Sequence, residues 1–267
     1  MIAAAGPSVK TLAPQCSVMR LVYVDVDGTL VGPGGDLLWD GSAGVVEALL
    51  AARRAGLAVV PSSGRGRAQI FELCRLLGLP RGIGELGCVH VDVEGHQVRY
   101  ELGRFPFSGV TPVEAMHDRG AIAAACAFGL EPHEPWNEGR QATYLLRGRI
   151  DVADVNAALA AQGFDWCELV DNGELPRRGP GVHAYHLAPA GTGKAFGVRA
   201  DRLHHGLDRE DTAYVGDSTG DLACAPEVGQ LWLVANADPE IDWPFRTTRS
   251  HGAGVAEVLE RLLGPVQ

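Results

Sequence analysis

The first part of the chain alternates short apolar runs with amphipathic stretches. The runs Leu21–Val26 and Leu57–Pro61 are continuous and apolar, which is typical of buried strands. Each is followed by a stretch with apolar residues at helical spacing, at Ser42–Ala55 and Gly66–Leu77. Strands that alternate with helices in this way predict right-handed βαβ units and a parallel sheet.

The alternation changes after about residue 85. Two short segments, Cys88–Val93 and Gln97–Leu102, flank Glu94 and Gly95 and predict a hairpin. Further elements are predicted as helices and strands at Pro112–Phe128 (helix), Ala142–Arg147 (strand), Val152–Ala161 (helix), Trp166–Val170 (strand) and Val182–Ala188 (strand). This mixture predicts an α+β insert rather than a continuation of the parallel sheet.

The first pattern returns after Pro189. The predicted elements are a helix at Lys194–His204, a strand at Thr212–Val215, a short helix at Leu222–Ala225, a strand at Leu231–Ala235, and a last helix with one apolar face from Val255 to Leu263. We therefore predict one α/β core domain, formed by residues 19–84 and 189–267, and an inserted α+β domain at residues 85–188. Residues 1–18 are predicted to be either a disordered extension or the result of a misassigned start, because Met19 stands just before the first predicted strand.

Composition excludes several classes of protein. The chain has 267 residues, 46% of them hydrophobic, and a net charge of −10 at pH 7. Binding to nucleic acid would require a basic stripe, and a membrane span would require a longer apolar run, so neither partner is expected. The six cysteines have no CxxC spacing, and the N-terminus does not resemble a signal peptide. We expect a cytoplasmic protein with reduced thiols, as a monomer or homodimer.

Two carboxylates follow the first predicted strand. Asp25 and Asp27 end the apolar run, and Gly28 permits a tight turn beneath them. Because ligands of open α/β sheets bind at the carboxyl ends of strands, this pair can hold a metal or perform covalent and acid–base chemistry. A structural Asp before a turn is common, so the pair alone does not decide between these interpretations.

The second predicted strand also ends in polar residues. Ser62 and Ser63 precede Gly64 and Arg65. Hydroxyls, backbone N–H groups and a guanidinium suit the oxygens of a phosphoryl group. Taken alone, the segment is better explained as a Ser/Gly turn before a helix cap.

Two later segments contribute a lysine and two further acids. Lys194 ends the segment GTGK, but a nucleotide-binding P-loop would need Gly in place of Ala188 and Ser or Thr in place of Ala195. Asp217 follows a predicted strand, and Asp221 either joins it in a Mg²⁺ site or favours a helix start. Four such segments in this order, each at a strand end or helix start, are difficult to explain as turns.

Together the four segments resemble the motifs of the haloacid dehalogenase (HAD) superfamily. DVDGT at Asp25–Thr29 resembles the first motif, Ser63 the second, Lys194 the third and GDSTGD at Gly216–Asp221 the fourth. The position and mixed content of the insert are similar to the C2B cap of Cof-type phosphatases, subfamily IIB. The tail segments VANADPEI and HGAGVAEVLERLL are also similar to those of Cof-type phosphatases. The resemblance implies a Rossmann-like parallel-sheet core with an inserted α+β cap.

The resemblance also implies a role for each catalytic residue. Asp25 would attack phosphorus and form an aspartyl-phosphate intermediate. Asp27 would protonate the leaving oxygen and then deprotonate the attacking water. Ser63 would hydrogen-bond the phosphoryl group, and Lys194 would offset its charge.

The remaining motif residues would bind substrate and metal. Gly64 and Arg65 would contact the phosphoryl group. Mg²⁺ would be held by oxygen ligands from the acids of the first and fourth motifs: Asp25, the backbone carbonyl of Asp27, Asp217 and Asp221. Gly220 stands where many Cof-type sequences have Asn, and Leu86 replaces a residue that is often polar in relatives.

A Mg²⁺-dependent phosphatase acting on a small phosphorylated metabolite is therefore expected, with a sugar phosphate or a phosphoglycerate derivative as substrate. Asp27 favours phosphoryl transfer over dehalogenation. A phosphomutase of the phosphomannomutase type and a catalytically silent binding protein are the alternatives. Arg140, Arg147, His183 and His186 are candidates for substrate contacts in the cap, although a solvated surface position is the simpler explanation for any one of them.

Overall fold

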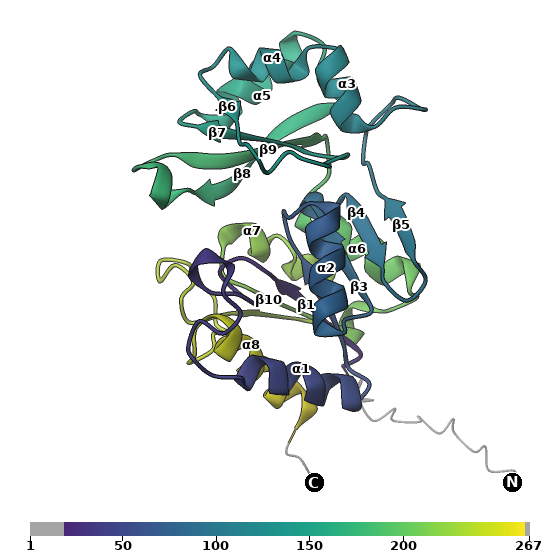
Figure 1. Ribbon diagram of the computed structural model, residues 1–267, viewed down its shortest axis with the longest axis vertical. Coiled ribbons are helices and arrows are strands. Elements are labelled where there is room, and N and C mark those ends of the chain that lie inside the picture. Colours follow the sequence, from purple (N-terminus) through teal and green to yellow (C-terminus); the bar gives the residue numbers. More distant parts are fainter. Residues whose placement is uncertain (1–18, 265–267) are drawn as a thin grey trace, which may run out of the picture.

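The computed structural model describes residues 19–264, whose strands form two separate sheets (Figure 1). The disordered extension predicted for residues 1–18 lies outside the described residues. In spatial order the first sheet contains β11 (Gln230–Leu233), β10 (Thr212–Gly216), β1 (Leu21–Asp25), β2 (Ala58–Ser62), β3 (Arg81–Gly84), β4 (Val89–Asp92) and β5 (Gln97–Tyr100). The second contains β6 (Glu131–Pro132), β7 (Tyr144–Gly148), β9 (His183–Pro189) and β8 (Cys167–Glu174).

Five strands of the first sheet are parallel. β1 lies between β10 and β2, β11 pairs with β10, and β3 pairs with β2. Asp25 at the end of β1 is in register with Ser62 at the end of β2. The carboxyl ends of β1, β2 and β10 therefore meet at the same edge of the sheet, as the βαβ pattern predicts.

Helices cover both faces of the first sheet, which explains why its strands are apolar throughout. They are α1 (Gly44–Arg54), α2 (Arg67–Leu77), α6 (Lys194–His204), α7 (Thr219–Leu222) and α8 (His251–Leu263). Val22 and Val24 belong to the hydrophobic cluster that includes α1, α2 and α8. Leu21 and Tyr23 point to the opposite face, into the cluster that includes Val198 of α6.

The predicted hairpin belongs to the first sheet. From the sequence we grouped it with the insert that begins at residue 85, but β4 pairs antiparallel with β3, and β5 pairs with β4. The physical reason is the tight reversal at Glu85–Gly87, where Glu85 and Leu86 have φ angles of 47° and 53°. The chain therefore returns directly beside β3 and pairs with its open edge.

The second sheet is antiparallel and lies between the first sheet and the helices α3 (Pro112–Asp118), α4 (Ala121–Cys126) and α5 (Val152–Ala161) (Figure 1). The single helix predicted at Pro112–Phe128 was wrong. Gly120 adopts a φ of 87° and separates α3 from α4, because a left-handed residue cannot continue a right-handed helix.

The fold class predicted from the sequence is confirmed: a largely parallel α/β sheet is accompanied by a separate antiparallel sheet with helices on one side. Within residues 19–264, none of the helices combines the length and the apolar character that crossing a bilayer requires.

Candidate active site

Three carboxylates and one ammonium group converge where β1 and β10 end. Asp25 is the last residue of β1, Asp217 follows β10, and Asp221 lies in α7. One oxygen from each carboxylate lies within 4.8 Å of the others. Lys194, the first residue of α6, donates from Nζ to Oδ1 of Asp25 and to Oδ1 of Asp221, both at 2.7 Å. The structure thus brings together four residues selected from three distant motifs.

Two glycines allow these carboxylates to approach. Gly28 has a φ of 89°, and a Cβ atom at this position would lie 2.2 Å from Oδ2 of Asp217. A Cβ atom at Gly216 would lie 2.4 Å from Cβ of Asp221. Non-bonded atoms do not come this close, so a residue with a side chain at either position would displace an acid of the site.

Asp221 uses both of its oxygens for hydrogen bonds. Besides Lys194, Oδ1 accepts the hydroxyl of Tyr214 at 2.8 Å. Oδ2 accepts the N–H groups of Asp217 and Ser218, both at 3.0 Å, and the Ser218 hydroxyl at 2.7 Å. The Asp221 side chain is fully buried. This geometry favours a role in orienting Lys194 and the loop after β10 over the direct metal ligation that the motif also allowed.

The electrostatics of the cluster fit a divalent cation. Burial raises the pKa of Asp25 well above its ordinary value; Lys194 opposes this, and Asp221 and Asp217 reinforce it. Burial, reinforced by Asp221, also raises the pKa of Asp217 to about 6. Three carboxylates face one ammonium group, so a divalent cation would balance the remaining charge. Carboxylate and carbonyl oxygens are the ligands that Mg²⁺ prefers, so Asp25, Asp217 and the backbone carbonyl of Asp27 suit it.

Asp27 lies apart from this cluster and is held by Arg65. The guanidinium binds both carboxylate oxygens, with Nε 2.9 Å from Oδ2 and Nη2 2.6 Å from Oδ1. The Asp27 side chain is 59% exposed, compared with 5% for Asp25. An acid–base role for Asp27 therefore requires Arg65 to release it.

Ser63 lies next to the candidate nucleophile. It directly follows Ser62, the register partner of Asp25, and is buried. Its Oγ accepts the backbone N–H of Arg65 at 3.2 Å. The hydroxyl hydrogen therefore remains available for a bound oxygen atom, as a phosphate-binding serine requires.

The four residues of the insert that were candidates for substrate contacts form two pairs in the structure. Arg140 donates from Nη2 to the carbonyl of Gly64 at 2.7 Å. His186 is fully buried, and its Nε2 lies 2.8 Å from the position that a Cβ atom of Gly64 would occupy. Arg147 and His183 instead pair with carboxylates of the second sheet, at 2.7 and 2.9 Å. Only the first pair approaches the loop that carries Ser63.

Two side chains that support the site were given no role in the sequence analysis, although Thr29 belongs to the first motif. The Thr29 hydroxyl donates to Oδ1 of Asp217 at 3.2 Å. Glu85 is fully buried, and its carboxylate accepts the N–H groups of Ala142 and Thr143, both at 2.9 Å. This carboxylate joins the loop after β3 to the base of β7. A Glu in a turn is usually solvated, so only tertiary structure shows this contact.

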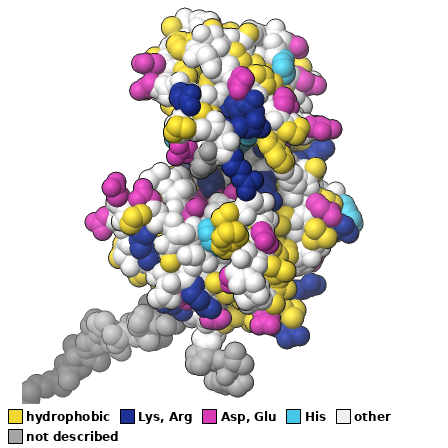
Figure 2. Space-filling view, turned by 60° about the vertical axis from the view of Figure 1, so that its left-hand side comes forward, with side chains coloured by type: hydrophobic (Ala, Val, Ile, Leu, Met, Phe, Trp, Pro, Cys, Tyr) yellow, Lys and Arg dark blue, Asp and Glu magenta, His cyan; other side chains and the backbone are white. Residues whose placement is uncertain are grey.

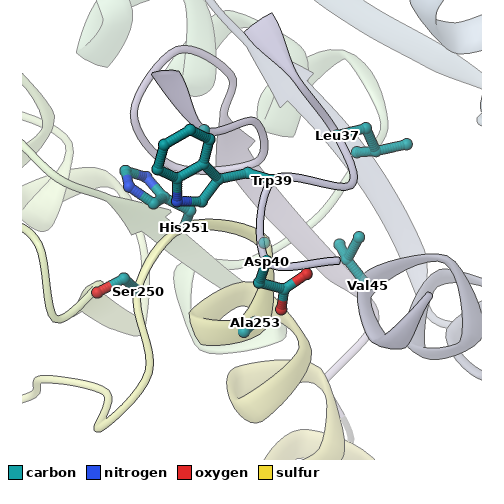
Figure 3. Close-up of a pocket in the computed structure, with 9 residues that line it drawn as sticks. Leu37, Trp39, Asp40, Val45, Ser250, His251 and Ala253 are labelled. Atoms are coloured by element: carbon teal, nitrogen blue, oxygen red, sulfur yellow. The ribbon is translucent and has the colours of Figure 1, made fainter. Parts of the chain in front are cut away.

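The turn after β1 is also held from the C-terminal part of the chain. The carbonyl oxygen of Gly28 accepts hydrogen bonds from Nδ2 of Asn236 at 2.8 Å and from Nδ1 of His251 at 2.9 Å. Figure 3 shows Trp39 beside His251 in a pocket next to this contact. The planes of the two rings lie at 84° to each other. Its cavity of about 10 Å³ has room for about one water molecule and is too small for a phosphate ester.

The surface around the site is more positive than the chain as a whole. Figure 2 shows Lys and Arg side chains gathered at the hollow between the two sheets, although the net charge of the chain is −10. A local positive field of this kind attracts anions into a hollow. The hollow is therefore suited to a phosphorylated ligand.

Known proteins resemble the chain over nearly its whole length, although no family model matches it. A phosphoglycolate phosphatase from Metallosphaera sedula is 30% identical over 250 residues, which cover 92% of this chain and 100% of the relative. A phosphoglycolate phosphatase from Methanothermobacter thermautotrophicus is 26% identical over 254 residues, with coverage of 92% and 100%.

Solved structures share the fold. A haloacid dehalogenase-like hydrolase from Bacteroides thetaiotaomicron superposes with a TM-score of 0.68 at 19% identity, covering 91% of this chain and 99% of that one. The sucrose-phosphatase of Synechocystis, solved with sucrose and phosphate, gives a TM-score of 0.63 at 18% identity, with coverage of 91% and 98%. At these identities the similarity establishes the arrangement of both sheets and not the substrate.

Proposed function

Since the chain belongs to the haloacid dehalogenase superfamily and is a phosphoric monoester hydrolase, we propose that it hydrolyses 2-phosphoglycolate or a closely similar small phosphate ester with Mg²⁺ as cofactor. The observation that carries the proposal is the Lys194 ammonium group, which joins Asp25 to Asp221 beside the Asp217 carboxylate. The substrate class is narrowed by relatives that match the chain over nearly its full length and are phosphoglycolate phosphatases.

Asp25 is the nucleophile in this proposal. Lys194 holds its Oδ1, so Oδ2 is the oxygen that attacks. A bond forms between Oδ2 and phosphorus while the bond from phosphorus to the ester oxygen breaks, and Asp25 becomes an aspartyl phosphate. Lys194 reduces the repulsion between the carboxylate and the phosphoryl group. When bound, Mg²⁺ would add positive charge at the phosphoryl oxygens.

Asp27 supplies and removes the protons. Once Arg65 releases it, the Asp27 carboxylate takes up a proton from solvent and passes this proton to the leaving oxygen. The resulting carboxylate then takes a proton from the water that hydrolyses the aspartyl phosphate. Before substrate binds, the Arg65 guanidinium donates hydrogen bonds to both oxygens of this carboxylate. A phosphoryl dianion offers the same guanidinium a bidentate partner, so substrate binding frees Asp27. Ser63 donates its hydroxyl hydrogen to a phosphoryl oxygen.

A phosphate-release assay tests the proposal. The purified chain is incubated with 2-phosphoglycolate, phosphoglycerates and sugar phosphates, with Mg²⁺ and after EDTA treatment. We expect phosphate release from 2-phosphoglycolate, loss of release in EDTA, and recovery when Mg²⁺ is restored. Preference for a sugar phosphate would contradict the proposal that 2-phosphoglycolate is the substrate. Isomerisation of a sugar phosphate with little free phosphate would identify a mutase.

The Asp25→Asn variant tests the nucleophile. It keeps the shape of the side chain but removes the attacking carboxylate, so we expect no detectable phosphate release and an unchanged circular dichroism spectrum. Asp118→Asn, at an exposed position of α3, is the matched control and should retain wild-type turnover. Wild-type turnover by Asp25→Asn would show that another group attacks phosphorus.

A further inference from the structure

A buried imidazole of the second sheet faces the Ser63–Arg65 loop with one nitrogen unpaired. His186 lies in β9, and within the described residues its Nε2 has no hydrogen-bond partner. This atom lies 2.8 Å from the position of a Cβ atom on Gly64, and Oδ1 of Asn172 lies 3.2 Å from the same position. Both side chains therefore pack so closely against Gly64 that a Cβ atom at this position would clash with Nε2 of His186, and only glycine fits between them and the loop.

A chain of hydrogen bonds sets which nitrogen of His186 carries the proton. Arg140 can only donate, and its Nη1 donates to Oγ1 of Thr143 at 2.9 Å. Oγ1 of Thr143 lies 3.0 Å from Nδ1 of His186. If the Thr143 hydroxyl donates to Nδ1, both groups are satisfied and the imidazole proton resides on Nε2. The opposite tautomer leaves the buried Thr143 hydrogen without this acceptor, which is unfavourable.

The imidazole stays neutral in this environment. Burial lowers the pKa of His186 well below its ordinary value, and the nearby positive charges of Arg140 and Lys194 lower it further. Nε2 is thus an uncharged N–H donor that is buried and unpaired, an arrangement that is costly until an acceptor arrives.

We propose that His186 donates from Nε2 to an oxygen atom in the organic part of the substrate and thereby selects esters that carry such an oxygen near the phosphoryl group. The inference rests on the proposed function, because the phosphoryl group must occupy the Ser63–Arg65 loop. Nε2 is enclosed in this structure, so the second sheet moves away as substrate enters, and the hydrogen bond forms as it returns.

Three matched substrates isolate this contact. Ethyl phosphate, 2-hydroxyethyl phosphate and 2-phosphoglycolate are all two-carbon esters, and they differ in whether the far carbon is a methyl group, a hydroxymethyl group or a carboxylate. A site built around a donor rejects a substrate that leaves this donor unpaired. We therefore expect the wild-type enzyme to have its lowest kcat/KM with ethyl phosphate.

The His186→Phe variant keeps a flat ring and removes the donor. We expect kcat/KM for the oxygen-bearing esters to fall about tenfold, while ethyl phosphate changes by no more than about twofold. A fall with only one of these two esters identifies the hydroxyl or the carboxylate as the acceptor. His186→Gln, whose amide can donate, should recover part of the loss. His183→Gln, on the same strand but paired with a carboxylate, is the control.

An equal fall with all three substrates, or no fall with any, would overturn the inference and leave the proposed function intact. Absence of phosphate release by the wild-type chain from every ester would instead overturn the proposed function. ¹⁵N NMR of the histidine side chains tests the tautomer without turnover. The His186 signals should show the proton on Nε2, and a proton on Nδ1 would also overturn the inference.

Discussion

The substitution Asp221→Asn distinguishes two roles that the fourth motif allows for this residue. As an anchor, Asp221 accepts five hydrogen bonds: from Lys194, Tyr214, the N–H groups of Asp217 and Ser218, and the Ser218 hydroxyl. Asn has the same shape but one oxygen. That oxygen can keep the three bonds to the loop, and the amide nitrogen can donate to Tyr214 if its hydroxyl turns. The bond to Lys194 has no replacement, because both groups are donors.

Loss of the ion pair between Lys194 and Asp221 sets the size of the expected change in the free energy of unfolding. Hydrogen bonds to charged groups contribute about 1.5–3 kcal/mol, and breaking a buried ion pair completely costs about 3–5 kcal/mol. Lys194 keeps Asp25 as a partner at 2.7 Å, and removal of one of three neighbouring carboxylates relieves repulsion. We therefore expect the free energy of unfolding to fall by about 2 kcal/mol. For a chain of this size the Tm should fall by about 4–8 °C.

Mg²⁺ binding is the deciding measurement. The Tm of wild-type, Asp221→Asn and Asp217→Asn proteins is followed as Mg²⁺ is added. If Asp221 is an anchor behind the metal site, its substitution should weaken the affinity for Mg²⁺ by about tenfold. Loss of a direct ligand should instead remove saturable binding in the millimolar range. The assignment of Asp221 as an anchor is wrong if Asp221→Asn keeps the wild-type Tm without Mg²⁺ and loses as much Mg²⁺ affinity as Asp217→Asn.

Two further substitutions test contacts around the site. Gly28→Ala introduces a Cβ atom 2.2 Å from Oδ2 of Asp217 at a φ of 89°, so kcat/KM should fall about 100-fold in steady-state assays, and wild-type kinetics would contradict this contact. Glu85→Gln weakens the acceptor of the Ala142 and Thr143 N–H groups. It should cost about 1–2 kcal/mol of stability and speed hydrogen exchange at these two amides, and unchanged exchange there would count against the link.

Regular elements were the part of the fold that local pattern predicted best. The helices at Val152–Ala161 and Lys194–His204 have the predicted bounds, because Asp151 caps the first and a glycine-rich turn precedes the second. The hairpin after residue 84 was predicted as a hairpin, but its pairing with β3 was not. Alternation of polar and apolar residues shows that a strand has two different faces, and it does not show which edge the strand joins.

The sequence by itself was enough to select residues that the structure brings together at the candidate site. Asp25, Asp217 and Lys194 could be selected because strand ends and helix starts are local features, and parallel topology places them at one edge. Only the tertiary structure decided that Asp221 has its oxygens filled by neighbours and that His186 reaches the Ser63–Arg65 loop. Hydrogen-bond partners are shared among groups distant in sequence, and their directions depend on how two sheets pack, which no local pattern encodes.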